Sequence, residues 1–182
     1  NVPSQRWLVD DAPGLTRFGG FIAGLQRFDA LAFALAPAEV AAMDPQQRLL
    51  LEVGYEALHG SGQRKGSLAS SDCAVCIGIE HVDWQLLQVL QTSKTASQRD
   101  SMYAGSGEQP HVASGRIAFQ LGMQGPTMSI NTACSSALVA AHCSAMSLCE
   151  VECKRALAAA VKVILLPFGV GGGITALDGR SK

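Results

Sequence analysis

Residues 125–150 read GPTMSINTACSSALVAAHCSAMSLCE, and this stretch decides the fold. The Gly125-Pro126 pair breaks any preceding helix, and the short, β-branched run from Thr127 to Asn131 alternates as a strand does. The run from Ser135 to Glu150 is apolar around most of its circumference, which is typical of a helix buried on several sides. The stretch therefore predicts a strand that turns directly into an interior helix.

The segments on either side alternate between strand and helix patterns. The run from Cys73 to Ile79 is continuously apolar, as in a buried strand, and the run from Ala156 to Leu166 predicts a second core strand. Residues 112–121 predict a helix. Loops are expected at Gly60–Asp72, Gln91–Ser101 and Gly169–Gly173. Strands that alternate with helices predict a layered α/β fold.

A further helix is predicted from Pro45 to about His59. Asp44 is a suitable N-cap, proline suits the first helical position, and Gln47 can complete a capping box. The glycines of Gly60-Ser61-Gly62 supply the stop signal. The apolar stripe of this helix is predicted on Leu49, Leu50, Val53 and Ala57.

The composition argues against several functional classes. The chain has 182 residues, 48% hydrophobic and 16% charged, which suits one domain with a buried core rather than a disordered segment. Its net charge is -1, so no broad basic surface for nucleic acid or anionic lipid is expected. The most apolar stretch, residues 156–170, is interrupted by Lys162 and Pro167 and is too short to span a bilayer. We expect neither a nucleic-acid partner nor membrane insertion.

The six cysteines lack the dense, regular spacing of a small secreted scaffold, and no secretory signal opens the chain. They are expected to be reduced thiols of an intracellular, cytoplasmic protein. Because the sequence starts at Asn1 rather than Met, an organelle-targeting segment ahead of it stays open.

Cys134 stands where the predicted strand meets the predicted helix. A thiol there faces unpaired backbone N–H groups and the positive end of the helix dipole, both of which favour the thiolate. The amides of Cys134 and Ser135 are candidate oxyanion donors, and the small neighbours Ala133, Ser135 and Ser136 leave room for a thioester carbonyl. The pattern alone leaves open whether Cys134 is such a nucleophile or a small buried hydrophobic residue.

Residues 132–142, TACSSALVAAH, resemble the nucleophile segment of β-ketoacyl synthases, specifically the ketosynthase domains of type I modular polyketide synthases. Residues 43–52, MDPQQRLLLE, resemble an opening motif of the type I branch. The other matches, in the family's order, are Arg6-Trp7, Gly19-Gly20-Phe21, Phe28-Asp29, Ser114–Ile117, Leu121-Gly122, Gly125-Pro126, Ser147-Leu148, Glu152-Cys153, Ala156–Ala158 and Leu177–Lys182. The resemblance covers essentially the whole chain.

The resemblance implies the thiolase-like fold, layered α-β-α-β-α. Residues 1–182 would form its N-terminal half, a partial ketosynthase domain that ends before the family's histidine motifs. It also implies acyl transfer from the phosphopantetheine of an acyl carrier protein to Cys134. A decarboxylative Claisen condensation with a malonyl-type extender would follow, in polyketide or fatty acid biosynthesis. The domain itself would bind no cofactor, and the two assisting histidines and a lysine are expected beyond Lys182.

The resemblance further implies a homodimer, because members of the family are dimers. In them the strand before the nucleophile lies near the two-fold interface. The candidate dimer contacts are Thr127, Met128, Ser129 and Ile130. Because the histidine motifs are missing from this stretch, a catalytically incomplete scaffold or carrier-protein docking piece is the alternative. Incubation with an acyl thioester would separate the two hypotheses.

Two positions depart from the family pattern. Asn131 stands where the family commonly has Asp. Residues 159–162, AAVK, replace the usual Gly-Gly-Val-Asn and would crowd any tight backbone approach. Neither departure removes the nucleophile.

The remaining chemical signals point to structural roles. Cys73 and Cys76 have the spacing of a metal pair, but on a strand their side chains point to opposite faces, so no metal site is predicted. Cys143, Cys149 and Cys153 are predicted to be core thiols. The glycines of residues 169–173 lack dinucleotide-binding spacing. His142 would lie about 12 Å beyond Cys134 along one helix, and none of the four histidines matches the family's catalytic motifs.

Overall fold

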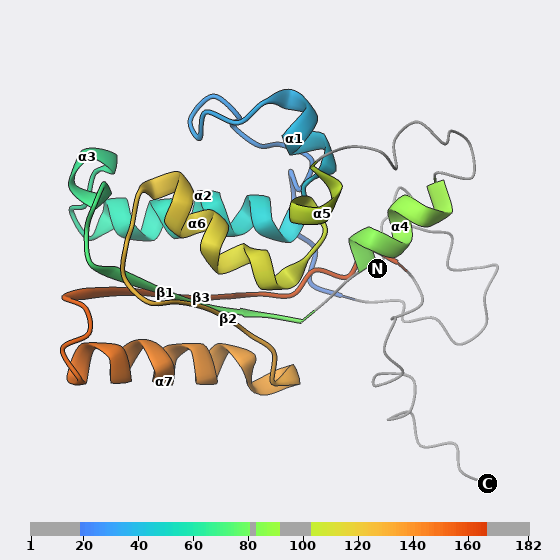
Figure 1. Cartoon of the computed structure of the whole chain (residues 1–182). Helices are drawn as coiled ribbons and strands as arrows, with labels where there is room; N and C mark the ends of the chain where they lie inside the picture. Colours follow the sequence, from blue (N-terminus) through green and yellow to red (C-terminus); the bar gives the residue numbers. More distant parts are fainter. Residues whose placement is uncertain (1–18, 81–82, 92–102, 167–182) are drawn as a thin grey trace, which may run out of the picture.

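Three parallel strands in the order β2-β1-β3 form the centre of the computed structural model, which describes residues 19–80, 83–91 and 103–166 (Figure 1). Helices lie on both faces of this sheet, so the predicted α/β class is confirmed. The elements are α1 (Pro37–Ala42), α2 (Pro45–Gly60), α3 (Lys65–Leu68), β1 (Cys73–Ile79), α4 (Asp83–Gln91), α5 (Ala104–Gly107), η3 (Pro110–Val112), α6 (Ala113–Leu121), β2 (Thr127–Ile130), η4 (Ala133–Ser135), α7 (Ser136–Cys149) and β3 (Arg155–Val161).

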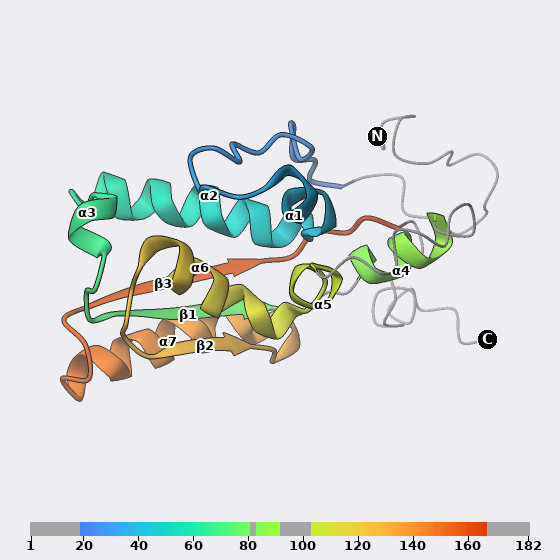
Figure 2. The same cartoon turned by 45° about the horizontal axis from the view of Figure 1, so that its top comes forward.

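Strand β1 lies between the other two strands, as Figure 2 shows. All seven of its residues are buried, which explains its continuous apolar run. Strand β3 is shorter than predicted because its last residue, Val161, pairs with Ile79, the last residue of β1. It is also less buried than a core strand, since it lies at the edge of the described sheet and Ala158 and Ala160 are exposed.

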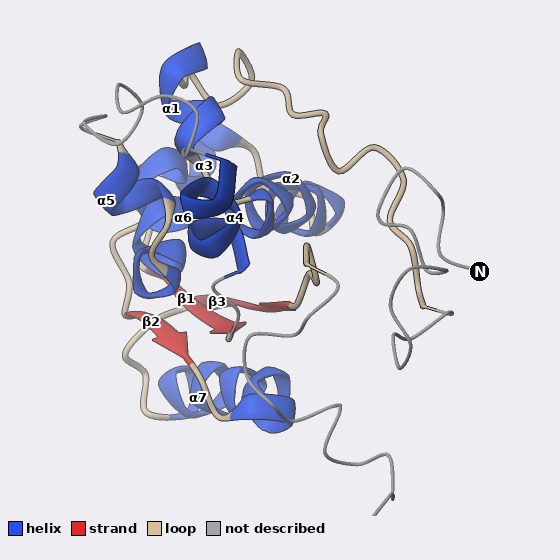
Figure 3. Ribbon diagram, turned by 90° about the vertical axis from the view of Figure 1, so that its right-hand side faces the viewer, coloured by secondary structure: helices blue, strands red, loops and turns tan. Residues whose placement is uncertain are grey.

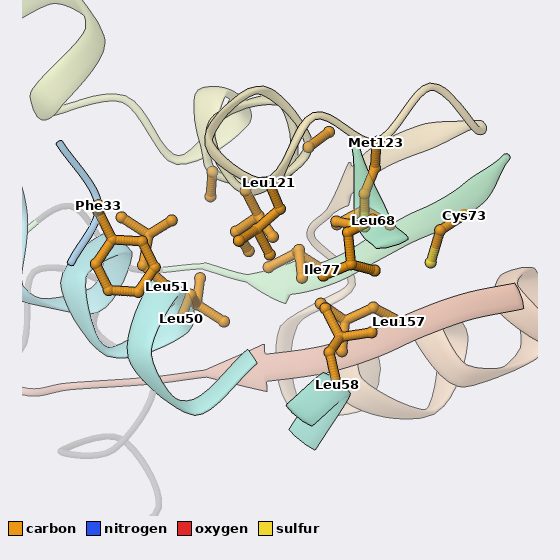
Figure 4. Close-up of a cluster of buried hydrophobic side chains, with 14 of the residues drawn as sticks. Phe33, Leu50, Leu51, Leu58, Leu68, Cys73, Ile77, Leu121, Met123 and Leu157 are labelled. Carbon is orange, nitrogen blue, oxygen red and sulfur yellow. The ribbon is translucent and has the colours of Figure 1, made fainter. Parts of the chain in front are cut away.

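Helices α2 and α6 cover one face of the sheet and α7 covers the other (Figures 1 and 3). The main hydrophobic cluster fills the space between the sheet and the α2 and α6 side (Figure 4). Leu51, Leu68 and Ile77 are fully buried there, and burial of each such side chain contributes about 1.5–3 kcal/mol. This cluster fixes the sheet against α2 and α6, and leaves the opposite face to α7.

Leu68 comes from a segment predicted as a loop. The polar stretch from Gly60 to Asp72 contains the helical turn α3, whose Leu68 is fully buried. One apolar side chain among polar neighbours has no periodicity, so the sequence pattern did not reveal this turn. Helix α1 was likewise not predicted.

Helix α2 begins as predicted, with Pro45 in its first turn and the Asp44 carboxylate accepting a hydrogen bond from the Gln46 amide at 2.7 Å. Its buried face was predicted only in part: Leu50 is buried as expected, but two other positions of the predicted stripe are not. Val53 is 57% exposed and Ala57 is exposed, whereas Gly54 and Leu58 are buried. At Gly54 an added Cβ would lie 3.4 Å from Leu157 Cδ2, so the glycine turns toward β3 and sets the helix rotation.

Gln47 does not close the predicted capping box. Its Nε2 donates to the carbonyl oxygens of Ser106, Gly107 and Gln109 at 3.3, 3.1 and 3.2 Å. Its Oε1 accepts from Arg116 Nε at 2.6 Å, and Arg116 Nη1 pairs with Glu39 Oε1 at 2.6 Å. This polar network ties α1, α2, α6, α5 and the chain just after α5 into one side of the molecule.

The chain that follows β3 is held by two further side chains. Gln46 Oε1 accepts from the Val163 amide at 3.1 Å, and Asp83 Oδ2 accepts from the Leu165 amide at 2.9 Å. The MDPQQ motif therefore anchors segments distant in sequence as well as the start of α2. Several predicted features, including most of loop 91–101, the turn 169–173 and the motifs at residues 6–7 and 177–182, lie outside the described residues.

Candidate active site

Cys134 lies on η4, the short 3-10 turn that joins β2 to α7. The side chain is exposed, as nucleophilic chemistry requires, and it is not a buried hydrophobic residue. The predicted strand, turn and helix are all present. The turn occupies Ala133–Ser135, so α7 begins at Ser136 rather than Ser135 and Cys134 precedes it.

Short polar side chains hold this turn in shape. Asn131 Oδ1 accepts from the Ala133 amide at 3.1 Å, which supports the left-handed backbone of Ala133 at φ 53°. Ser136 Oγ accepts from the Thr132 amide at 2.9 Å and donates to the Ala133 carbonyl at 2.8 Å. A left-handed non-glycine residue is strained, and it persists only where its surroundings impose it. These hydrogen bonds supply that constraint directly before the thiol.

The same geometry accounts for one departure from the family pattern. Asn131 acts through its Oδ1 atom, and aspartate offers the same acceptor at the same place. The substitution therefore preserves the turn. At the second departure, Ala159 lies against the hydrophobic cluster and Ala160 is exposed, so the predicted crowding is not seen in the described residues.

The backbone amides around the thiol differ in their availability. The Ser135 amide donates to the Thr132 carbonyl at 3.3 Å, and the Ser136 amide donates to the Ala133 carbonyl. No hydrogen bond joins the Cys134 amide to another described residue. Of the two predicted oxyanion donors, the amide of Cys134 is therefore the more available.

Gly78, a residue that sequence reasoning did not single out, lies directly beneath the start of α7. A Cβ placed on it would lie 2.8 Å from both the carbonyl carbon and the oxygen of Ser136. The available signal was a lone glycine inside an apolar strand, which often marks a close backbone approach.

The sequence predicted that α7 is buried on several sides, but the described residues cover only one side of it. The residues it buries are Ser136, Ala140, Ser144 and Ser147. Leu138 is 70% exposed, and Met146 and Leu148 are exposed as well. In the described part of the chain α7 contacts the sheet along one narrow side of small residues, which leaves the apolar remainder uncovered.

The other cysteines are divided between buried and exposed positions. Cys153 is buried, as predicted, whereas Cys143 is half-buried and Cys149 is exposed, so the prediction of core thiols was wrong for Cys149. Cys73 belongs to the hydrophobic cluster on the α2 side, while Cys76 lies beside Ser144 of α7, so the two thiols face opposite sides of the sheet. Burial raises the pKa of both thiols.

The histidines in the described residues are not bonded to Cys134. His142 is exposed on α7, and His59 and His111 are exposed on α2 and η3. His81 lies outside the described residues. Within the described ranges no three His, Cys, Asp or Glu side chains gather as metal ligands, and no helix there is long and apolar enough to cross a membrane.

Comparison with known proteins places this geometry in context. The family model described as "Beta-ketoacyl synthase, N-terminal domain" matches residues 2–177. A phenolphthiocerol/phthiocerol polyketide synthase of Mycobacterium tuberculosis is 38% identical over 175 residues, which cover 91% of this chain and 11% of that protein. Erythronolide synthase EryA3 of Saccharopolyspora erythraea is 42% identical over 171 residues, 91% of this chain and 5% of that protein.

Solved structures show the same likeness. The ketosynthase from module 6 of the bacillaene synthase of Bacillus subtilis 168 superimposes with a TM-score of 0.76 at 30% identity, covering 92% of this chain and 26% of that one. The oxazolomycin ketosynthase domain OzmH KS7 of Streptomyces albus JA3453 gives a TM-score of 0.77 at 25% identity, covering 91% of this chain and 30% of that one. The chain therefore spans less than a third of each of these proteins.

Proposed function

Because the chain belongs to the β-ketoacyl synthase family, as the N-terminal portion of a ketosynthase domain of the modular polyketide synthase type, we propose that Cys134 is its acyl-accepting nucleophile. The exposed thiol on a constrained turn between β2 and α7 is the observation that carries this proposal. The substrate class is an acyl thioester on the phosphopantetheine of an acyl carrier protein.

The first half-reaction follows from the turn. Cys134 Sγ attacks the thioester carbonyl, a carbon–sulfur bond to Cys134 forms, and the carrier thiolate leaves. The tetrahedral intermediate carries a negative oxygen, for which the unbonded Cys134 amide is a donor. Each such donor contributes about 10²–10³ in rate in other acyl-transfer enzymes.

The second half-reaction needs groups outside the described residues. A malonyl-type extender loses CO₂, the resulting enolate carbon attacks the Cys134 thioester, and the cysteine leaves as thiolate from a chain longer by one extender unit. The resemblance implies that two histidines assist decarboxylation, and none of the four histidines of this sequence lies in a matching motif. We therefore assign this assistance to residues outside the described part. This makes the 3-oxoacyl-[acyl-carrier-protein] synthase reaction the proposed activity.

Strand β2 is the proposed dimer contact. It pairs with β1 on one side, and within the described sheet its other edge has no strand beside it. Thr127 is exposed, and Met128, Ser129 and Ile130 are half-buried. An open edge of unpaired backbone groups is suited to pairing with a second chain.

Acyl transfer to an intact protein tests the proposal. The protein that carries this sequence is incubated with a short acyl thioester of pantetheine, and its mass is measured with and without Cys134→Ala. The wild type should gain one acyl group, and Cys134→Ala should gain none. Cys149→Ala is the matched control, because Cys149 is an exposed thiol at the other end of α7 and its loss should leave the labelling unchanged.

Two outcomes contradict the nucleophile assignment. Labelling that persists in Cys134→Ala would place the acyl group on another residue. Binding of the carrier protein without any labelling would favour the alternative, a catalytically incomplete scaffold or docking piece.

A further inference from the structure

We propose that Gly78 of β1 is a positioning residue for Cys134, because the absence of its side chain sets how closely the start of α7 approaches the sheet. The inference rests on the proposed function and adds to it a residue on another element, distant in sequence from the thiol. Gly78 is buried in β1, and it acts through the backbone of Ser136.

The contact leaves no room for adjustment by side chains. A Cβ on Gly78 would lie 2.8 Å from the Ser136 carbonyl carbon and oxygen and 3.0 Å from the Ala137 amide nitrogen. All three atoms belong to the backbone of the first turn of α7, so none can rotate away. Ordinary contacts between non-bonded carbons lie at about 3.5–4.0 Å, so a methyl group would push this turn away by roughly 0.7–1.2 Å.

Displacement of Ser136 is passed on to the thiol. Ser136 follows Cys134 by two residues, and its hydroxyl binds the Thr132 amide and the Ala133 carbonyl on the other side of the cysteine. The other end of the turn is held by β2, whose Ile130 pairs with Gly78 itself. Gly78 therefore supports the turn from both ends, and a shift on one side alone distorts it.

The rest of the helix–sheet contact is built in the same way. Ala140, Ser144 and Ser147 continue the buried side of α7 with small side chains, and Ala140 is fully buried one turn after Ser136. A larger side chain at Ala140 would widen the same gap from the helix side. Substitutions at Gly78 and at Ala140 therefore change the same distance, between the start of α7 and the sheet, from two different elements.

Replacement of Gly78 should affect two reactions of Cys134, acyl transfer and alkylation, to different extents. Acyl transfer needs the sulfur and the Cys134 amide aligned on one carbonyl, and a misplacement of about 1 Å can lower such a rate about 10²-fold. Alkylation by iodoacetamide needs only an accessible thiolate. A positioning residue should therefore alter the first reaction far more than the second.

The test compares both rates at Cys134 in the protein that carries this sequence, normalised to the folded fraction measured by near-UV circular dichroism. Gly78→Ala should lower the rate of acylation by an acyl-pantetheine thioester about 10²-fold. Its alkylation rate should change less than about threefold. Gly125→Ala is the control, because its Cβ would lie 2.5 Å from the Cys73 carbonyl, an even tighter backbone contact at the opposite end of β1.

Gly125→Ala should lower stability while leaving the ratio of acylation to alkylation at its wild-type value. If Gly78→Ala does not fold, Ala140→Val is measured in its place, with the same selective loss expected. An unchanged ratio in the folded variant, or an equal fall in Gly125→Ala, would overturn the role of Gly78. A wild type that is alkylated but never acylated would instead contradict the proposed function.

Discussion

Replacement of Glu39 by Gln removes the charge that faces the buried guanidinium of Arg116. The two side chains meet at 2.6 Å, and the side chain of Arg116 is only 6% exposed, against 22% for Glu39. Arg116 Nε also donates to Gln47, and α6 reaches β2 through the hydrogen bond from the Ser114 amide to Ser129 Oγ at 3.1 Å. The ion pair therefore stabilises the side of the molecule that supports the strand before Cys134.

The magnitude follows from the burial. Unit charges about 4 Å apart attract by about 4 kcal/mol at an effective dielectric constant of about 20. The glutamine amide keeps a neutral hydrogen bond of about 1 kcal/mol, and solvent at the partly exposed Glu39 screens some of the remainder. We expect Glu39→Gln to lower the free energy of unfolding by about 2 kcal/mol.

A matched control is available at Glu80, which pairs with Lys162 at 3.0 Å. There the side chains are 29% and 40% exposed. Glu80→Gln makes the same chemical change in a more exposed pair and should cost less than about 0.5 kcal/mol. Urea unfolding followed by circular dichroism measures both, and a double-mutant cycle with Arg116→Met isolates the Glu39 pair. Equal effects of the two substitutions would refute the argument from burial.

Three further predictions concern the cysteines and the turn. In the native protein an alkylating reagent should modify the exposed Cys134 and Cys149 at least about tenfold faster than the buried Cys73 and Cys76. Peptide mass spectrometry measures these rates, and modification of Cys73 at the rate of Cys149 would contradict the prediction. Burial raises the pKa of the Cys73 and Cys76 thiols, whereas thiols of the unfolded chain ionise near pH 8.5. Above about pH 8.5 the unfolded state therefore binds fewer protons than the native state. The free energy of unfolding should then fall as the pH rises toward the raised pKa, by at most about 1.4 kcal/mol per pH unit for each thiol. Urea midpoints at pH 8 and 10 measure the slope, which Cys76→Ala should reduce, and a flat profile would argue against buried, protonated thiols. Asn131→Leu removes the acceptor of the Ala133 amide and should lower the free energy of unfolding by about 1 kcal/mol. Asn131→Asp keeps the acceptor and should lower this free energy by less. Equal losses in the two variants would show that the hydrogen bond does not hold the turn.

The site was predictable from sequence where its signals are close along the chain. The strand Thr127–Ile130, the turn with Cys134 and the helix that follows occupy consecutive residues, so periodicity and small residues suffice to locate them. The start of α2 at Pro45, with its Asp44 cap, was predictable for the same reason.

The same reasoning failed where burial depends on neighbours distant in sequence. The apolar circumference of α7 predicted a helix covered on several sides, yet Leu138 is 70% exposed in the described part of the chain. The stripe predicted for α2 missed the buried Gly54, whose role follows from the approach of Leu157. The hydropathy of a residue indicates whether its side chain can be buried, but it does not indicate which residue distant in sequence packs against it.

The order of residues alone predicted the α/β class and the strand–turn–helix around Cys134, because hydrogen bonds and steric preferences between residues close along the chain produce these elements. The family resemblance of the same residues singled out the Cys134 thiol as the one to test. Only the folded chain decided that Gly78 supports Ser136 and that Glu39 meets Arg116 across 77 residues of sequence. Such contacts form when separate elements pack, and their distances depend on the sheet register and helix positions together. No pattern within a short window of sequence contains that information.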